Sequence, residues 1–149
     1  MEYFAYSQKE FVYKYVVMLS DTDQFKHMSF ANYLRLMFLA TDALLQGFTD
    51  TVFLSQKRIR LVHSRMKFKR QSVAGDSILV KVNSSNLEKN SFTLLYTFLT
   101  EGSAELVALG RQAFECIGLV GKTSEEIPQP MRALLDPIAV KEEHLLYSY

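Results

Sequence analysis

Two aspartates and a histidine lie close together in one polar segment of the sequence. Residues 20–33 read SDTDQFKHMSFANY, with Asp21, Asp23 and His27 in a loop that leads into a helix predicted over residues 30–45. The first turn of a helix has backbone N–H groups without internal partners and a partial positive charge, so it can stabilise an oxyanion. A carboxylate beside such groups can act as a general base or as a nucleophile. The segment therefore brings together the groups needed to hydrolyse an acyl bond.

Structural roles explain the same residues at least as well. Aspartates are common in turns and caps, so Asp21 and Asp23 could simply stabilise the loop, and Ser29 is a suitable N-cap for the helix. His27 could orient Asp23, act as an acid, or be bonded to the backbone. An EF-hand calcium loop is excluded, because its sixth position has no glycine and its twelfth has no glutamate.

The other residues that could react are scattered along the chain. His63 lies within a predicted strand, His144 lies near the tail, and Cys116 lies in a strand pattern typical of a core residue. They form no metal-ligand spacing, so we expect no metal and no cofactor. No Gly-x-Ser-x-Gly motif is present, which argues against a serine α/β-hydrolase, and there is no glycine-rich phosphate loop.

Length and composition predict one globular domain over residues 1–149. The chain is 48% hydrophobic and 13% aromatic, which is ample for a core. Its net charge of +1 gives no reason to expect nucleic-acid binding. One cysteine suits a reducing compartment, no signal peptide is recognised, and no apolar run reaches the roughly 20 residues of a membrane span. We therefore expect a soluble cytoplasmic protein that does not act at a membrane.

The predicted helix over residues 30–45 is apolar nearly all round, so other elements must enclose it. Leu34, Met37, Phe38 and Leu45 form one stripe at helical spacing, and Gly47 is a suitable terminator. Strands are predicted over residues 11–19, 58–69, 77–83, 91–100 and 106–119, followed by a short helix over 131–135. Short turns favour antiparallel neighbours. The simplest arrangement is an α+β fold with one antiparallel sheet wrapped around one central helix.

The polar segment resembles the 4-hydroxybenzoyl-CoA thioesterase-like branch of the hotdog superfamily. Asp21-Thr22-Asp23, His27-Met28 and Asn32-Tyr33 fall at the family's spacings. Lys26 replaces the family's glycine, and Ser29-Phe30 replaces its Asn-Asn pair. The run of residues 30–33 is also similar to thioesterases of enediyne polyketide pathways. Those enzymes usually have asparagine at the position of Asp23 and an arginine at the position of Thr41. Asp23 therefore makes this chain more similar to the branch that uses a carboxylate.

The resemblance implies a hotdog fold, with a five-stranded antiparallel sheet around a long central helix. It also implies a thioesterase that acts on an acyl-CoA or on an acyl carrier protein. Asp23 would attack the thioester or activate a water, Asp21 would brace the loop, and the backbone N–H near Phe30 would hold the carbonyl oxygen. Asn32 and Tyr33 would contact substrate. Chains of the family pair side by side into dimers, and the dimers often form tetramers, so we expect a homo-oligomer.

Basic residues cluster in and after the strand predicted over residues 58–69. Arg58, Arg60, Lys67, Lys69 and Arg70 are candidates for binding CoA phosphates or an acidic carrier protein, because both substrates are anionic. For any one of them, a solvated strand face is the slightly favoured explanation.

Two further functions stay open from the sequence. A non-catalytic acyl-binding module is suggested by the departures from the family pattern at Lys26, Ser29 and Phe30. A hotdog dehydratase or hydratase would need a histidine and an acidic residue arranged differently around the helix, and that pattern is not found here. The acyl chain is not specified either, because aromatic residues such as Phe25 and Phe38 fit an acyl site and a core equally well.

Overall fold

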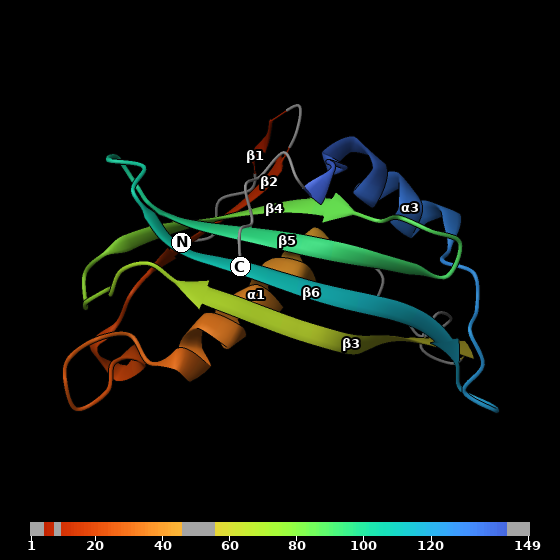
Figure 1. Cartoon of the computed structure of the whole chain (residues 1–149), viewed down its shortest axis with the longest axis horizontal. Coiled ribbons are helices and arrows are strands. Elements are labelled where there is room, and N and C mark those ends of the chain that lie inside the picture. The colour runs from red at the N-terminus through yellow and green to blue at the C-terminus, as the bar shows by residue number, and fades with distance from the viewer. Residues whose placement is uncertain (1–4, 8–9, 46–55, 143–149) are drawn as a thin grey trace.

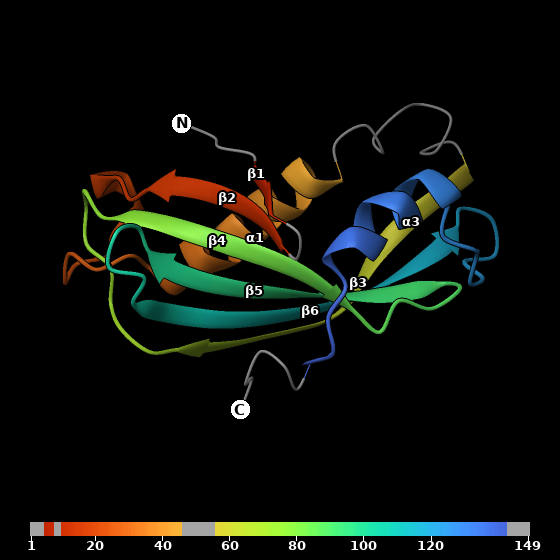
Figure 2. The ribbon, with the colours of Figure 1, turned by 90° about the horizontal axis from the view of Figure 1, so that it is seen from above.

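The structure, a computed structural model, describes residues 5–7, 10–45 and 56–142. In these ranges the chain forms a six-stranded antiparallel sheet in the order β1-β2-β4-β5-β6-β3, which curves around the helix α1 (Figures 1 and 2). The elements are β1 (Ala5–Ser7), β2 (Glu10–Val16), η1 (Leu19–Asp21), α1 (Phe30–Leu44), β3 (Lys57–Phe68), β4 (Ser77–Ser85), β5 (Ser91–Thr100), β6 (Leu106–Gly118), α3 (Gln129–Leu135) and η2 (Asp136–Ile138). This architecture confirms the predicted hotdog fold, with β1 as a short additional strand. None of the helices in these ranges combines the length and the apolar character that crossing a membrane requires.

The core lies between α1 and the face of the sheet that turns toward it. In β5 every second side chain points into this core and is at most 1% exposed: Phe92, Leu94, Tyr96 and Phe98. The helix approaches β6 closely at Gly110, where a Cβ atom would come within 2.5 Å of Met37 Sδ. A Cβ atom at this position would therefore force the end of the Met37 side chain to move.

The sheet covers one face of α1 and leaves the other open. Met37 and Leu45 are buried in the core, whereas Phe38 is 65% exposed and Leu34 is only partly buried. The apolar stripe predicted from the sequence is thus divided between two environments, because it is wide enough to span two faces of the helix. The open face of α1 lies beside β3, which is an edge strand of the sheet.

Two strands end at other residues than the sequence predicted, and hydrogen bonds explain both differences. β2 stops at Val16, because the chain turns into η1, where the Asp21 carboxylate accepts a hydrogen bond from the Met18 N–H. β4 continues to Ser85, because the buried Ser84 hydroxyl donates to the Leu135 carbonyl (2.6 Å) and so joins the strand to α3. Gly47 and His144 lie outside the described residues.

Candidate functional site

Asp23 lies in a tight turn between η1 and α1. Its Oδ1 accepts hydrogen bonds from the backbone N–H groups of Phe25 (2.8 Å) and His27 (3.4 Å). The backbone closes the turn, because Asp23 N–H donates to the His27 carbonyl (2.9 Å) and Lys26 N–H donates to the Asp23 carbonyl (3.0 Å). No described residue bonds Asp23 Oδ2. One carboxylate oxygen is therefore held by the turn, and the other is available to a ligand.

Lys26 explains why this turn favours glycine in the family that the segment resembles. Its φ of +66° lies in the left-handed region, which costs a residue with a side chain about 1–2 kcal/mol. The lysine adopts the conformation that the turn requires, so the substitution leaves the path of the loop intact.

Asp21 anchors the loop to its neighbours on both sides. Its Oδ2 accepts hydrogen bonds from the Tyr15 hydroxyl (2.6 Å) and the Met18 N–H (2.8 Å). Its carbonyl accepts from the Ser29 N–H (3.0 Å) and from Asn32 Nδ2 (2.8 Å). Burial and the bond to Asp21 raise the pKa of Tyr15, which stays a protonated donor. Asp21 is 6% exposed, so it holds the loop and does not meet a ligand.

The first turn of α1 has N–H groups without acceptors in the described part of the chain. Ser29 is the N-cap, but its side chain does not cap the helix and instead accepts a hydrogen bond from Asn32 Nδ2 (2.9 Å). The N–H groups of Phe30 and Ala31 therefore have no acceptor among the residues that the structure describes. Helix α1 has 15 residues, so its N-terminus also carries a partial positive charge.

A cavity of about 390 Å³ opens where the turn, the start of α1 and the end of β3 meet. We call it the loop cavity; it is lined by Asp23, Phe25, His27, Met28, Phe30, Tyr33, Phe68, Lys69, Arg70 and Gln71. Its apolar wall is aromatic, because the Phe68 ring lies 5.4 Å from that of Phe30 and 5.0 Å from that of Tyr33. The Tyr33 hydroxyl donates to Ser72 Oγ (3.2 Å), and burial raises the pKa of this tyrosine. The cavity thus joins a carboxylate and exposed amide groups to an apolar surface.

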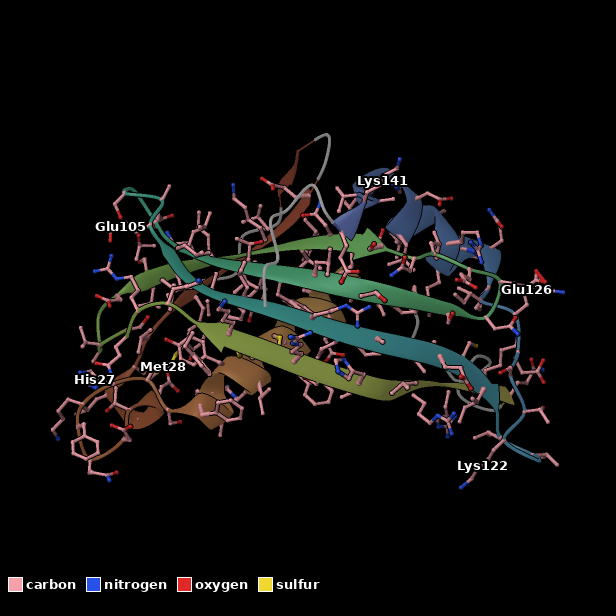
Figure 3. The ribbon with its side chains drawn as sticks, in the orientation of Figure 1. His27, Met28, Glu105, Lys122, Glu126 and Lys141 are labelled. Carbon is pink, nitrogen blue, oxygen red and sulfur yellow. The ribbon has the colours of Figure 1, made fainter. Side chains whose placement is uncertain are left out.

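The predicted basic residues separate into two groups. Lys69 and Arg70 line the loop cavity, at the end of the molecule where Figure 3 shows His27 and Glu105. Arg70 forms an ion pair with Glu105. Arg58 and Arg60 lie at the opposite end of β3, where Arg60 pairs with Glu115 (3.0 Å).

The structure thus brings six of the ten predicted site residues to one cavity: Asp23, His27, Phe30, Tyr33, Lys69 and Arg70. Asn32 contributes instead to the loop, through its bonds to Asp21 and Ser29. Lys67 is half-buried in β3 and is not part of the cavity lining. Phe68 was not among the predicted site residues, although its ring forms the wall opposite Phe30.

Two further reactive residues of the described chain, His63 and Cys116, lie outside the cavity. His63 is exposed on β3, and Cys116 is fully buried in β6. Burial raises the pKa of the Cys116 thiol, which keeps it protonated and unreactive.

A second cavity of about 260 Å³ lies between the open face of α1 and β3. We call it the helix–strand cavity; it is lined by Phe30, Leu34, Phe38, Leu61, Ser64, Arg65, Met66 and Gln112. Phe30 lines both cavities, so they are neighbours across its ring. Sequence reasoning missed Ser64 and Gln112. The available signal was that Gln112 shares its side of β6 with Gly110 and Phe114, which makes it a polar residue at a core position.

Comparison with known proteins shows the family to which the chain belongs. The model of the thioesterase-like superfamily matches residues 17–135, which include the turn, α1 and the strands β3 to β6. No curated protein sequence matches the chain. The family match supports the hydrolysis of acyl thioesters as the general activity.

Solved structures share the fold. A 1,4-dihydroxy-2-naphthoyl-CoA thioesterase from Synechocystis superposes with a TM-score of 0.77 and 24% identity, over 85% of this chain and 96% of that one. The dynemicin thioesterase gives a TM-score of 0.80 and 21% identity, over 89% and 99%. A Staphylococcus aureus protein solved in complex with CoA gives 0.78 and 14%, over 90% and 86%. At these identities the likeness concerns the fold alone.

Proposed function

Because the chain belongs to the thioesterase-like superfamily, we propose that it hydrolyses an acyl thioester of coenzyme A or of an acyl carrier protein, with Asp23 as the catalytic carboxylate. One observation carries this proposal. Asp23 Oδ2 and the N–H groups at the start of α1 are both without protein partners in the described chain, and Asp23 and Phe30 line the same cavity. A carboxylate and an oxyanion site are the two groups that thioester hydrolysis requires.

The chemistry follows from this pairing. The thioester carbonyl oxygen would accept hydrogen bonds from the Phe30 and Ala31 N–H groups, which are fixed by the helix and stabilise the negative charge that develops on it. Asp23 would either take a proton from a water that attacks the carbonyl carbon, or attack that carbon itself to form an anhydride that water then cleaves. In both routes the carbon–sulfur bond breaks, and the departing sulfur is protonated. His27 lines the same cavity, and its side chain has no described partner, so it is the candidate donor of that proton.

Lys69 is the candidate contact for the phosphates of the substrate. It is exposed, lines the loop cavity and forms no ion pair with a described carboxylate, whereas Arg70 is paired with Glu105. A lysine at the mouth of an apolar cavity attracts an anionic carrier group to the side where its acyl group must enter. Both coenzyme A and a phosphopantetheinyl carrier protein supply such an anionic carrier group. The names of the Synechocystis thioesterase and of the CoA-bound Staphylococcus protein favour coenzyme A.

A homo-oligomer is part of the proposal, with β3 as the contact. β3 is an edge strand of 12 residues that pairs on one side with β6. Its register shifts between Leu61 and His63, and the intervening Val62 is 59% exposed. A long edge strand with exposed apolar side chains invites pairing with another chain. Phe38, on the neighbouring face of α1, is 65% exposed and would be covered by the same contact. A dimer or tetramer in the cytoplasm remains our expectation.

Replacement of Asp23 tests the catalytic assignment. In Asp23→Asn the amide oxygen can still accept from the Phe25 and His27 N–H groups, so the turn is retained while the negative charge is lost. We expect kcat on an acyl-CoA panel to fall by about 10²–10⁴-fold, the range of a lost general base. Asp42→Asn, an exposed position on α1, is the matched control and should keep full activity. Thiol release is measured with Ellman-type detection.

The same assay separates the alternatives. Full activity of Asp23→Asn would remove Asp23 from the mechanism. Binding of acyl-CoA without thiol release by the wild-type chain would identify an acyl-binding module, and hydration of enoyl-CoA without thiol release would identify a hydratase. Hydrolysis in ¹⁸O-labelled water, followed by mass spectrometry of the Asp23 peptide, tests the nucleophilic route, because label in the Asp23 carboxylate requires an anhydride that water cleaves at the Asp23 carbonyl.

A further inference from the structure

A chain of buried polar side chains runs through the core and ends at the helix–strand cavity. Thr41 Oγ1 lies 2.6 Å from the Tyr96 hydroxyl, which donates to Gln112 Oε1 at 3.0 Å. Gln112 Nε2 donates in turn to Ser64 Oγ at 3.1 Å. Tyr96, Thr41 and Gln112 are 0%, 9% and 5% exposed, whereas Ser64 is exposed and lines the cavity. Three buried residues from α1, β5 and β6 therefore hold one hydroxyl group in β3.

The direction of these bonds leaves one donor free. Thr41 gives its single hydroxyl proton to the Met37 carbonyl (2.8 Å). Tyr96 is therefore the donor in both of its bonds and shares its own proton between Thr41 Oγ1 and Gln112 Oε1. Gln112 uses its amide N–H to bond a lone pair of Ser64 Oγ. The hydroxyl proton of Ser64 has no acceptor among the described residues. Since Gln112 occupies one lone pair, the proton is directed away from the sheet interior, on the side where Ser64 lines the cavity.

The rest of this cavity is mainly apolar and continues from the loop cavity. Leu34 and Phe38 line it from the helix, and Leu61 and Met66 line it from the strand. From Phe30, which lines both cavities, to Phe38 the helix rises about 12 Å. An acyl chain whose thioester lies at Asp23 can therefore extend past Phe30 along α1 and meet the Ser64 hydroxyl on its way.

Resting on the thioesterase function proposed above, we propose that Ser64 is a specificity-determining residue. It donates a hydrogen bond to a hydroxyl or oxo oxygen on the acyl chain, and Gln112 positions it for this contact. A purely structural role, in which Gln112 only satisfies the buried Tyr96 hydroxyl, would not require a further hydroxyl group at position 64 in the cavity wall. Such a contact can be measured as a preference between substrates, since a neutral hydrogen bond changes affinity by roughly three- to tenfold.

The test compares octanoyl-CoA with its hydroxy and oxo derivatives, which carry the oxygen at successive carbons. For the wild-type chain we expect kcat/KM to be roughly three- to tenfold higher for the derivative whose oxygen reaches Ser64 than for octanoyl-CoA. Ser64→Ala should reduce this ratio to about one, while Ser64→Thr, which keeps the hydroxyl, should retain most of it. Gln112→Met should reduce the ratio as well. A loss of folded protein lowers both rates equally, so the ratio reports positioning and not stability.

Each outcome decides the proposal. Hydrolysis without preference for any oxygenated chain, or a preference that survives Ser64→Ala, overturns the role of Ser64 and leaves the thioesterase function standing. If no thioester is hydrolysed, the proposed function fails, and calorimetry with free octanoic and hydroxyoctanoic acids then tests the cavity. Tighter binding of a hydroxy acid that is lost in Ser64→Ala supports the proposal, and equal binding overturns it.

Discussion

Replacing Lys26 with glycine should stabilise the protein, although lysine is the native residue. At a φ of +66° the lysine carries a steric cost of about 1–2 kcal/mol, which glycine does not have. Glycine adds about 0.5–1 kcal/mol of conformational entropy to the unfolded chain, which offsets part of the gain. From the midpoints of the two ranges, the expected net increase in the free energy of unfolding is about 0.8 kcal/mol. For a chain of this size that raises Tm by roughly 1–4 °C.

Equilibrium urea unfolding of Lys26→Gly, Lys26→Ala and the wild-type chain tests this reasoning. Lys26→Ala removes the same charge and the same long side chain but keeps the Cβ atom, so it should show no gain. The N–H of residue 26 still donates to the Asp23 carbonyl in each variant, so the turn is preserved. If the glycine and alanine variants unfold at the same urea concentration, backbone strain at this position does not exist, and the account of the turn is wrong.

Two further predictions concern the loop anchor and the sheet edge. Tyr15→Phe should cost about 1–3 kcal/mol, because the buried Asp21 carboxylate loses a hydroxyl partner. The raised pKa of Tyr15 means that its contribution is present below about pH 10 and is lost as pH rises through the pKa of the folded state. Wild-type stability should accordingly fall more steeply above pH 10 than that of Tyr15→Phe, and equal slopes in urea titrations would contradict this. Val62→Lys should reduce the sedimentation mass to that of a monomer, whereas Val120→Lys, at a position 92% exposed in a turn, should not. A monomeric wild-type chain would refute the contact through β3.

The sequence determined the elements and the chemistry of the loop. The strand over residues 91–100 was predicted, and large apolar side chains at every second position of it indicate which face meets the core, because a strand sends successive residues to opposite faces. The spacing of Asp23, His27 and Phe30 around the start of α1 is local, so a short segment of sequence already indicates that these groups come together. The same reasoning treated Lys26 as a departure from the family pattern, since φ is not visible in a sequence.

Only the tertiary structure decided what forms the rest of the two cavities. Phe68 and Lys69 join the loop because β3 pairs with β6 and ends beside α1, which is a long-range contact without a local signal. The five basic candidates look alike in sequence, yet the length of β3 separates Arg58 and Arg60 from the cavity that Lys69 lines. Ser64 and Gln112 meet because the register of β3 against β6 sets them opposite one another, and a shift of β3 by one residue would turn Ser64 to the other face of the sheet.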